Sequence, residues 1–240
     1  MTHWALVGHD GQRARAFSLE DTALMYAADG TDATAALAAL GPVPDHILRI
    51  GEGQPDAVPA ALLPATPGPG LAGLVQKVPP DVIDGWVRLL LIGLTQDRPN
   101  WEGIACVRAG DIRHWVHVSA GEAVSCQSFL TPRLAATLGA KTPPDPAAVA
   151  DSLSRPERLA AHLRSAEVTG NIAALSGHLI GAELAASRPY WLGQEGALIA
   201  PAGAGSDLAD ALEGQGVQTQ RLDPESLLAP AFTALSTWLD

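Results

Sequence analysis

Residues 104–130 read IACVRAGDIRHWVHVSAGEAVSCQSFL. Three apolar or alternating runs make up most of this stretch: Ile104 to Val107, His114 to Ser119, and Ala123 to Leu130. The turn-forming pairs Gly110-Asp111 and Ala120-Gly121 separate the runs. Short runs with glycine turns between them are typical of antiparallel strands joined by hairpins. We therefore predict a three-stranded antiparallel meander here.

The residues before this stretch predict a mixture of strands and helices. A β-hairpin is expected at the N-terminus, where Trp4 to Val7 and Arg13 to Leu19 flank the turn Gly8-His9-Asp10-Gly11. Four further elements are then expected: a helix over Thr31 to Leu40, a strand over His46 to Ile50, a loop over 51–80, and a helix over Asp81 to Leu94. The loop follows from its many prolines and glycines and its lack of a period.

After residue 131 the pattern becomes mainly helical. Helices are expected over Leu134 to Leu138, Pro146 to Leu163 and Asn171 to Ser187, followed by strand Ala197 to Ala200, helix Ser206 to Leu212, strand Val217 to Leu222 and helix Ser226 to Leu239. The fold class is therefore α/β. The change of character near 131 predicts two α/β lobes, 1–130 and 131–240, and no internal repeat is evident.

Composition excludes several classes of protein. Hydrophobic residues make up 47% of the 240 residues, which indicates a globular chain rather than a disordered one. The net charge of −11 disfavours nucleic acid and anionic membranes as general partners. Two cysteines cannot form a disulfide framework or a closed zinc site, so we expect Cys106 and Cys126 to be buried thiols.

The chain carries no sign of targeting. Its start lacks a basic segment followed by a long apolar one, as a secretory signal would have. The longest apolar run, Leu89 to Leu94, is far shorter than a membrane span. We therefore expect a soluble, cytoplasmic protein.

Three glycine-containing turns are candidate ligand sites. The turn Gly8-His9-Asp10-Gly11 either cradles a phosphate with its backbone amides or is a plain hairpin turn. Ala109-Gly110-Asp111 either forms a second phosphate turn, with Asp111 near a metal, or caps its own backbone. The loop 201–206 lies between an expected strand and helix, where nucleotide sites often begin, or it is a structural connection.

Other polar and small residues favour packing. Gly177, Gly181 and Ala185 share one face of an expected helix and permit close contact with a neighbour. Glu183, on the same helix, is expected to be exposed, although it could bind a ligand. His114 and His117 point to opposite faces of their strand, which argues against a shared metal, and no His, Cys, Asp and Glu cluster has metal-ligand spacing in the sequence.

The two hairpins with polar turns, the helix with small residues and the glycine loop before a helix follow one another in a characteristic order. This order resembles that of the sugar kinases of the actin/hexokinase-like superfamily, and within them the 2-dehydro-3-deoxygalactonokinase family. The resemblance covers nearly the whole chain. It rests mainly on four stretches: Asp81-Val82-Ile83-Asp84-Gly85, Gly110 to Val116, Val124 to Leu134, and Leu179-Ile180-Gly181-Ala182-Glu183-Leu184. Val7, Arg15, Ala16 and Phe17 fit the family's N-terminal hairpin.

The resemblance implies a two-lobed, ribonuclease H-like fold, here reduced in size. It implies a Mg-ATP site and transfer of the γ-phosphate to a hydroxyl group of 2-dehydro-3-deoxy-D-galactonate. Phosphoryl transfer of this kind depends mostly on positioning and on charge neutralisation. Acidic residues that hold Mg²⁺ and small polar turns that hold phosphate are therefore expected.

This sequence departs from the family pattern at those positions. Gly8 stands where the family has an aspartate on its first strand. The segment that reads Arg-Gly-Glu-Glu-Thr in the family is Asp84-Gly85-Trp86-Val87-Arg88, so both glutamates are missing. The family's Thr-Gly-Glu-Leu is Thr131-Pro132-Arg133-Leu134, in which a base replaces an acid. Residues that pack match the family, whereas residues of the site do not.

We therefore hypothesise that phosphoryl transfer is impaired or lost and that a ligand-binding or regulatory role remains. In the alternative, an active kinase, Asp10 and Asp111 hold Mg²⁺ and act in catalysis, and Arg15 contacts phosphate or substrate. Gly11, Gly110, Ala202 and Gly203 then contact the nucleotide. A third hypothesis is a structural partner subunit, and a homo-oligomer is compatible with each.

Overall fold

The computed structural model describes residues 3–20, 23–41 and 44–239. Contacts group the chain into two units. Unit 1 comprises Met1–Glu102, His117–Cys126 and Leu222–Asp240, and unit 2 comprises Gly103–Val116 and Gln127–Arg221. Each unit draws on both sides of residue 131, which differs from the predicted lobes 1–130 and 131–240. The difference arises because strand pairing and helix packing bring distant segments together within each unit.

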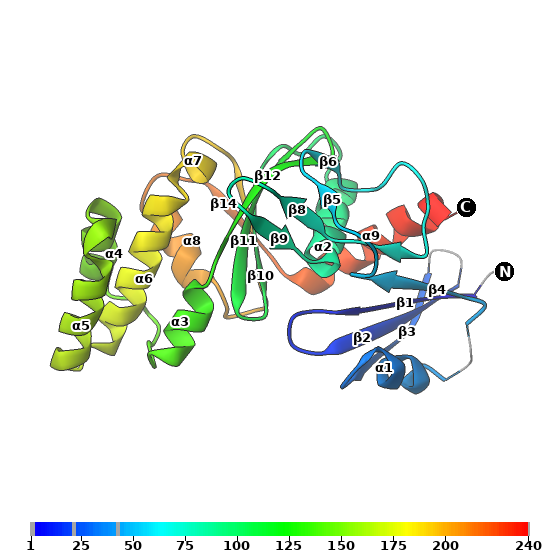
Figure 1. The fold of residues 1–240 in the computed structure, drawn as a ribbon, viewed down its shortest axis with the longest axis horizontal. Helices are drawn as coiled ribbons and strands as arrows, with labels where there is room; N and C mark the ends of the chain where they lie inside the picture. The colour runs from blue at the N-terminus through cyan, green and yellow to red at the C-terminus, as the bar shows by residue number, and fades with distance from the viewer. Residues whose placement is uncertain (1–2, 21–22, 42–43, 240) are drawn as a thin grey trace. The chain divides into compact units, whose positions relative to one another are not determined.

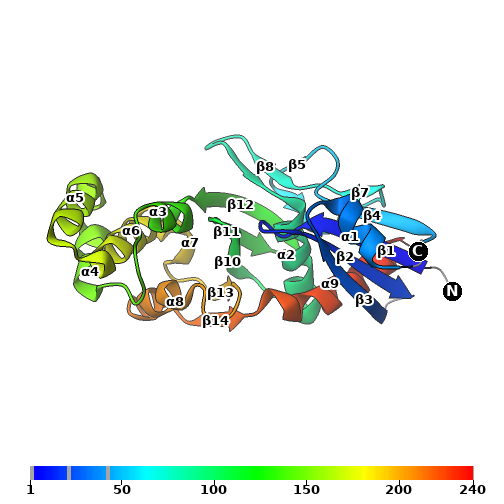
Figure 2. The same cartoon turned by 90° about the horizontal axis from the view of Figure 1, so that it is seen from below.

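A five-stranded sheet in the order β3-β2-β1-β4-β7 forms the base of unit 1. Its strands are β1 (His3–His9), β2 (Ala14–Glu20), β3 (Ala23–Gly30), β4 (His46–Ile50) and β7 (Gly70–Leu71). β1, β2 and β3 form an antiparallel meander, and β4 pairs parallel to β1 (Figure 2). The predicted N-terminal hairpin is therefore confirmed, and β3 is a strand that the sequence did not predict.

Both faces of β1 and β2 are buried, against helices α1 (Ala33–Ala39), α2 (Gly85–Asp97) and α9 (Pro224–Leu239). One face carries small side chains such as Ala5, Val7 and Ala16, and α1 packs there through Ala36. On β2, the Phe17 ring contacts Trp86 of α2, with ring centroids 6.2 Å apart, and Phe232 of α9, at 5.0 Å. The two-sided burial accounts for the continuous apolar run Trp4 to Val7 of β1.

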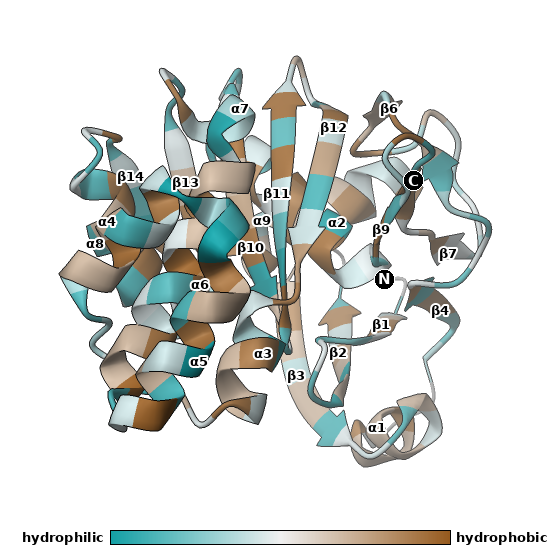
Figure 3. Ribbon diagram, turned by 60° about the vertical axis from the view of Figure 1, so that its left-hand side comes forward, coloured by the Kyte–Doolittle hydropathy of each residue, from teal (hydrophilic) through white to brown (hydrophobic). Residues whose placement is uncertain are grey.

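The second sheet has six strands in the order β14-β13-β10-β11-β12-β6. They are β6 (Ala60–Ala61), β10 (Gly103–Ala109), β11 (Ile112–Ser119), β12 (Glu122–Phe129), β13 (Gly196–Ile199) and β14 (Thr219–Leu222). The predicted meander is confirmed as β10, β11 and β12, and Figure 3 shows hydrophobic and hydrophilic bands along β11. β13 pairs parallel to β10 as β4 pairs to β1. The strand order of the first sheet is thus repeated here, although the sequence shows no repeat.

Residues 51–80 were predicted as a loop but contain four very short strands. They are β5 (Asp56–Ala57), β6, β7 and β8 (Leu74–Gln76). The expected helix from Asp81 is also wrong in its first turn, because Asp81–Ile83 forms β9, antiparallel to β8. Asp84 accepts a hydrogen bond from the amide of Val87 and so caps α2. Strands of two or three residues are too short to show a period in the sequence.

A buried guanidinium holds residues 51–80 in place. Arg88 lies on α2 with its side chain only 1% exposed. Its three nitrogens donate to the carbonyl oxygens of Ala61, Leu62 and Ala72, and Nη1 lies 2.8 Å from a carboxylate oxygen of Asp56. A buried cation needs a partner for each of its donors. This one side chain therefore binds four residues of the segment and holds them against α2.

The close packing of α2 on α9 gives a test of the core of unit 1. A Cβ atom added at Gly93 of α2 would lie 2.1 Å from the carbonyl oxygen of Leu227 on α9. Helix propensity alone predicts that Gly93→Ala stabilises the protein, by about 1 kcal/mol. We expect the opposite sign, a loss of about 1–3 kcal/mol in the free energy of unfolding, because the helices must move apart.

Denaturant unfolding measures this difference. The matched control is Gln96→Ala, at an exposed position of the same helix, which should change the free energy of unfolding by less than about 0.5 kcal/mol. A Gly93→Ala variant as stable as the control would contradict the packing described for α2 and α9.

Helices form most of unit 2. They are α3 (Thr131–Thr137), α4 (Pro146–Ser154), a 3-10 turn (Pro156–Arg158), α5 (Leu159–Thr169), α6 (Ile172–Ala186), α7 (Arg188–Trp191) and α8 (Ser206–Glu213). The single helix predicted over Pro146 to Leu163 is wrong, because the chain breaks at Arg155, the residue before Pro156. α4, α5 and α6 lie side by side (Figure 1).

The small residues of α6 serve packing, as predicted. A Cβ atom at Gly177 would lie 2.5 Å from the carbonyl oxygen of Asp145, and one at Gly181 would lie 2.2 Å from that of Val149. Both partners belong to the start of α4 or its N-cap. α6 and α4 therefore approach each other more closely than larger side chains would permit.

Glu183 of α6 is buried, so the expectation that it is exposed is wrong. One of its carboxylate oxygens accepts from Arg113 Nη1 at 2.7 Å, and the other accepts from Trp115 Nε1 at 2.8 Å. The side chains of Glu183 and Arg113 are 0% and 7% exposed. Arg113 and Trp115 lie two residues apart on β11, so their side chains share a face of the strand. This cluster attaches α6 to β11.

Removing one member of this ion pair should be costly. We expect Glu183→Leu to lower the free energy of unfolding by about 3–5 kcal/mol, because the Arg113 guanidinium would stay buried without its partner. The double variant Arg113→Met/Glu183→Leu should be clearly more stable than the single one, because it removes both charges and keeps the volume. Chemical denaturation of the four proteins of this cycle measures the coupling, and additive effects would contradict it.

Neither cysteine is exposed. Cys106 and Cys126 are buried free thiols, as predicted. Burial raises the pKa of both thiols, that of Cys126 to about 12. No helix among the described residues is long and apolar enough to cross a bilayer.

Candidate functional site

The first candidate turn joins β1 to β2 in unit 1. Asp10 Oδ1 accepts hydrogen bonds from the amides of Gln12 and Arg13, at 2.8 and 2.9 Å, and the Gly11 amide donates to His9 Nδ1. Gly11 has φ +93°, which favours glycine. The amides that would cradle a phosphate therefore bind side chains of the turn itself. Asp10 Oδ2 remains outside these bonds, 3.8 Å from Arg13 Nε.

Arg15, the predicted phosphate or substrate contact, is held by acids of unit 1. Its two terminal nitrogens bind the carboxylate of Glu225 on α9, and its Nε lies 3.5 Å from Asp29 on β3. The guanidinium also lies over the Phe17 ring, 5.0 Å from its centroid. The side chain is only 11% exposed. In this arrangement Arg15 links β2 to α9, and a phosphate would have to replace its carboxylate partners.

The second candidate turn joins β10 to β11 in unit 2. Gly110 has φ +57°, and Asp111 follows it. Both carboxylate oxygens of Asp111 are taken by Arg133 of α3, through Nε at 2.6 Å and Nη2 at 3.0 Å, and the Arg133 amide donates to the Asp111 carbonyl. These bonds hold the pKa of Asp111 below its usual range. Asp111 is therefore ionised, but its charge is already matched.

The third candidate is the loop between β13 and α8, and its strand–loop–helix order is confirmed. Ala202 and Gly203 are exposed, and Gly203 has φ +78°. Gly205 precedes the first turn of α8 and has no side chain that could cap it. The amides of this first turn are therefore left for solvent or a ligand. Of the three candidates, this loop leaves its backbone donors most open.

The predicted Mg²⁺ ligands do not fit a metal well. One oxygen of Asp10 closes its own turn, and Asp111 is paired through both oxygens with an arginine. Hard divalent cations need several free oxygen ligands, and neither carboxylate has both of its oxygens free. The roles of Asp10, Asp111, Arg15, Gly11, Gly110, Ala202 and Gly203 as site residues stay predictions.

The comparison with solved structures identifies the fold. A protein from Sinorhizobium meliloti, assigned as a 2-dehydro-3-deoxygalactonokinase, superposes with a TM-score of 0.81 at 21% identity, over 98% of this chain and 99% of that one. Component A of the (R)-2-hydroxyglutaryl-CoA dehydratase from Acidaminococcus fermentans superposes with a TM-score of 0.52 at 12% identity, over 99% and 97%. The predicted actin/hexokinase-like fold, of α/β class, is therefore confirmed.

The comparison with protein families identifies the family. No curated protein matches the sequence significantly. The family described as 2-keto-3-deoxy-galactonokinase matches residues 53–235, which is more than half of the chain. The match covers β9, β11, β12 and α6, which contain most of the four stretches on which the resemblance rests. The chain belongs to the 2-keto-3-deoxy-galactonokinase family.

Proposed function

We propose that this family member retains a ligand-binding or regulatory role and has impaired or lost phosphoryl transfer. The observation that carries the proposal is the pairing of Asp111 with Arg133. Arg133 stands where the family pattern has a glutamate. An acid that could serve a metal is therefore replaced by a base, and this base neutralises the nearest remaining acid.

The loss of the acid matters more than the strength of the new ion pair. Arg133 and Asp111 are 48% and 54% exposed, and solvent-exposed pairs contribute little stability. A metal with other good ligands would displace such a pair easily. The missing glutamate cannot be recovered in that way, and a metal in phosphoryl transfer needs its carboxylates to neutralise and orient the phosphates.

One observation favours the alternative, an active sugar-acid kinase with rearranged acids. The loop before α8 keeps the open backbone donors that nucleotide sites use. In that case Mg-ATP and a sugar acid are the ligands, Asp10 and Asp111 hold the metal, and Ala202 and Gly203 contact the nucleotide. Location in the cytoplasm stays a prediction with either function.

Ligand binding is tested first by thermal unfolding. The melting temperature is measured alone, with Mg-ATP, with 2-dehydro-3-deoxy-D-galactonate, and with both. A ligand at 100 times its Kd stabilises the native state by about 2.7 kcal/mol, which gives a shift of several degrees. We expect a shift with at least one ligand. No shift with any of them, in a folded sample, would contradict the ligand-binding role.

A coupled assay of ADP release then tests phosphoryl transfer. We expect no turnover of the sugar acid above background in the natural protein, and a measurable gain in Arg133→Glu, which restores the family's acid. The matched control is Arg133→Gln, which removes the positive charge without adding an acid and should stay inactive. Efficient turnover in the natural protein that Asp10→Asn and Asp111→Asn abolish would replace our proposal with the active-kinase alternative.

A further inference from the structure

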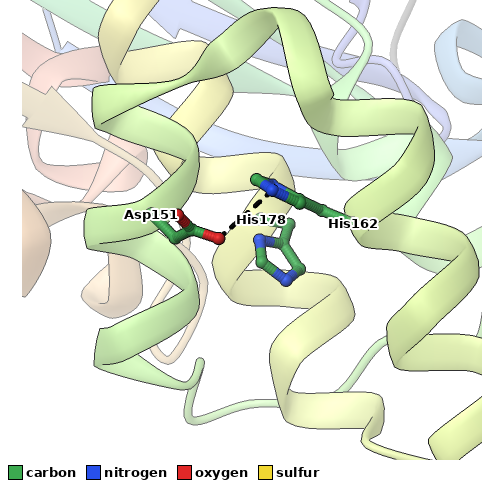
Figure 4. Close-up of side chains that lie close together, drawn as sticks. All are labelled: Asp151, His162 and His178. Atoms are coloured by element: carbon green, nitrogen blue, oxygen red, sulfur yellow. Dashed lines mark ion pairs between the residues drawn. The ribbon is translucent and has the colours of Figure 1, made fainter.

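Three polar side chains converge between the helices of unit 2, away from the turns discussed above. Asp151 lies on α4, His162 on α5 and His178 on α6 (Figure 4). Their potential ligand atoms all lie within 4.8 Å of one another. His162 Nε2 lies 3.2 Å from Asp151 Oδ2, and the two imidazole rings have centroids 4.7 Å apart. The residues are separated by 11 and 16 positions, so no motif in the sequence marks them.

We propose that Asp151, His162 and His178 form a binding site for a divalent transition metal ion such as Zn²⁺. Two imidazole nitrogens and one carboxylate oxygen are a donor set that suits zinc and its neighbours, and they leave one position for water. Mg²⁺ prefers sites made of oxygen atoms, so this site is distinct in chemistry from the Mg²⁺ that a kinase of this family would use.

The spacing of the ligand atoms fits a tetrahedral ion. Zinc lies about 2.0–2.1 Å from nitrogen and oxygen ligands, so neighbouring ligand atoms of a tetrahedron are about 3.3 Å apart. The separation of 3.2 Å between His162 Nε2 and Asp151 Oδ2 already matches this value. The other separations are at most 4.8 Å, so the ligand atoms would draw closer together around a bound ion.

The groups that orient metal ligands are also in place. Ser152 is fully buried, and its Oγ lies 3.0 Å from His162 Nδ1 and 2.9 Å from His178 Nδ1. A hydroxyl oxygen can accept from both Nδ1–H groups, and in those tautomers each Nε2 carries a lone pair that can bind a metal. His178 also has a hydrogen bond to the backbone of Ala148, which a bound metal would have to leave or replace. Arg155 binds Asp151 Oδ1, the oxygen that does not face His162. Such outer contacts orient the ligands of metal sites.

Electrostatics agree in direction with this geometry. Burial, and to a lesser extent the nearby His162, lower the pKa of His178, which favours its neutral imidazole. Hydrogen bonding to Arg155 lowers the pKa of Asp151, which favours its ionised carboxylate.

An ion can reach the cluster from the surface. Asp151 and His178 line an open pocket of about 420 Å³, together with Asp145, Arg155 and Asn171. His162 is 9% exposed and Asp151 is 31% exposed, so the acid is the outermost ligand. The pocket leaves room for a water molecule as fourth ligand. Without a metal, the same groups form a hydrogen-bonded chain that joins the three helices, and the experiment must distinguish these two roles.

Zinc binding is measured by titration calorimetry on the full chain without an affinity tag, in 1 mM Mg²⁺. We expect one Zn²⁺ per chain, and Co²⁺ in its place should give the strong visible absorption of a four-coordinate ion. Asp151→Asn, His162→Gln and His178→Gln should each weaken binding by at least 100-fold. Ser152→Ala, which only removes the orienting hydroxyl, should weaken it by about 10- to 100-fold. His117→Gln, outside the cluster, is the matched control and should bind as the natural protein does.

A second measurement remains decisive if a buried histidine variant fails to fold. In the natural protein labelled with ¹⁵N-histidine, Zn²⁺ should shift the ring signals of two of the seven histidines. Asp151→Asn, at the outermost ligand, should remove that effect at the same zinc concentration. A purely structural cluster is indicated if no histidine signal shifts, or if binding survives in the Asp151 and His178 variants, and either result overturns the proposal.

Discussion

The buried Arg113–Glu183 ion pair is the interaction on which unit 2 depends. It attaches α6 to β11, and the Trp115 indole completes the set of donors around the Glu183 carboxylate. α3, α4, α5, α7 and α8 all pack against α6. This polar contact and the apolar cluster beside it, which includes Ile180, Leu184 and Leu198, together hold the helices against the sheet. The partners of the ion pair lie 70 residues apart in the chain, so the pair exists only once the fold has formed.

In unit 1, the buried side chain of Arg88 stabilises residues 51–80 in a similar way. Its nitrogens donate hydrogen bonds to carbonyl oxygens of this proline- and glycine-rich segment. In the family pattern, this segment of α2 carries acids near its start, whereas here Trp86 and Arg88 are parts of the core. Where the family pattern has acids, α2 of this chain therefore has side chains that pack its own core and hold residues 51–80.

The charged side chains of the candidate site are also paired within the protein. Asp10, Asp111 and Arg15 are all charged side chains, and each already has a partner within its own unit. Charges that are satisfied internally stabilise turns and packing but are less available to a substrate. The cluster of Asp151, His162 and His178 differs, because its donors face one another across three helices and an open pocket. This convergence is the basis of the proposed metal site.

Local patterns in the sequence determined the hairpin at Gly8 to Gly11, the meander of 104–130 and the strand–loop–helix around 201–206, because turn chemistry and apolar periods act between neighbours. They also determined the packing role of Gly177 and Gly181. Only the tertiary structure decided that Glu183 is buried, that Arg88 organises residues 51–80 and that Arg133 neutralises Asp111. These outcomes depend on partners far away in the chain, and a side chain carries no local signal of which distant charge it will meet.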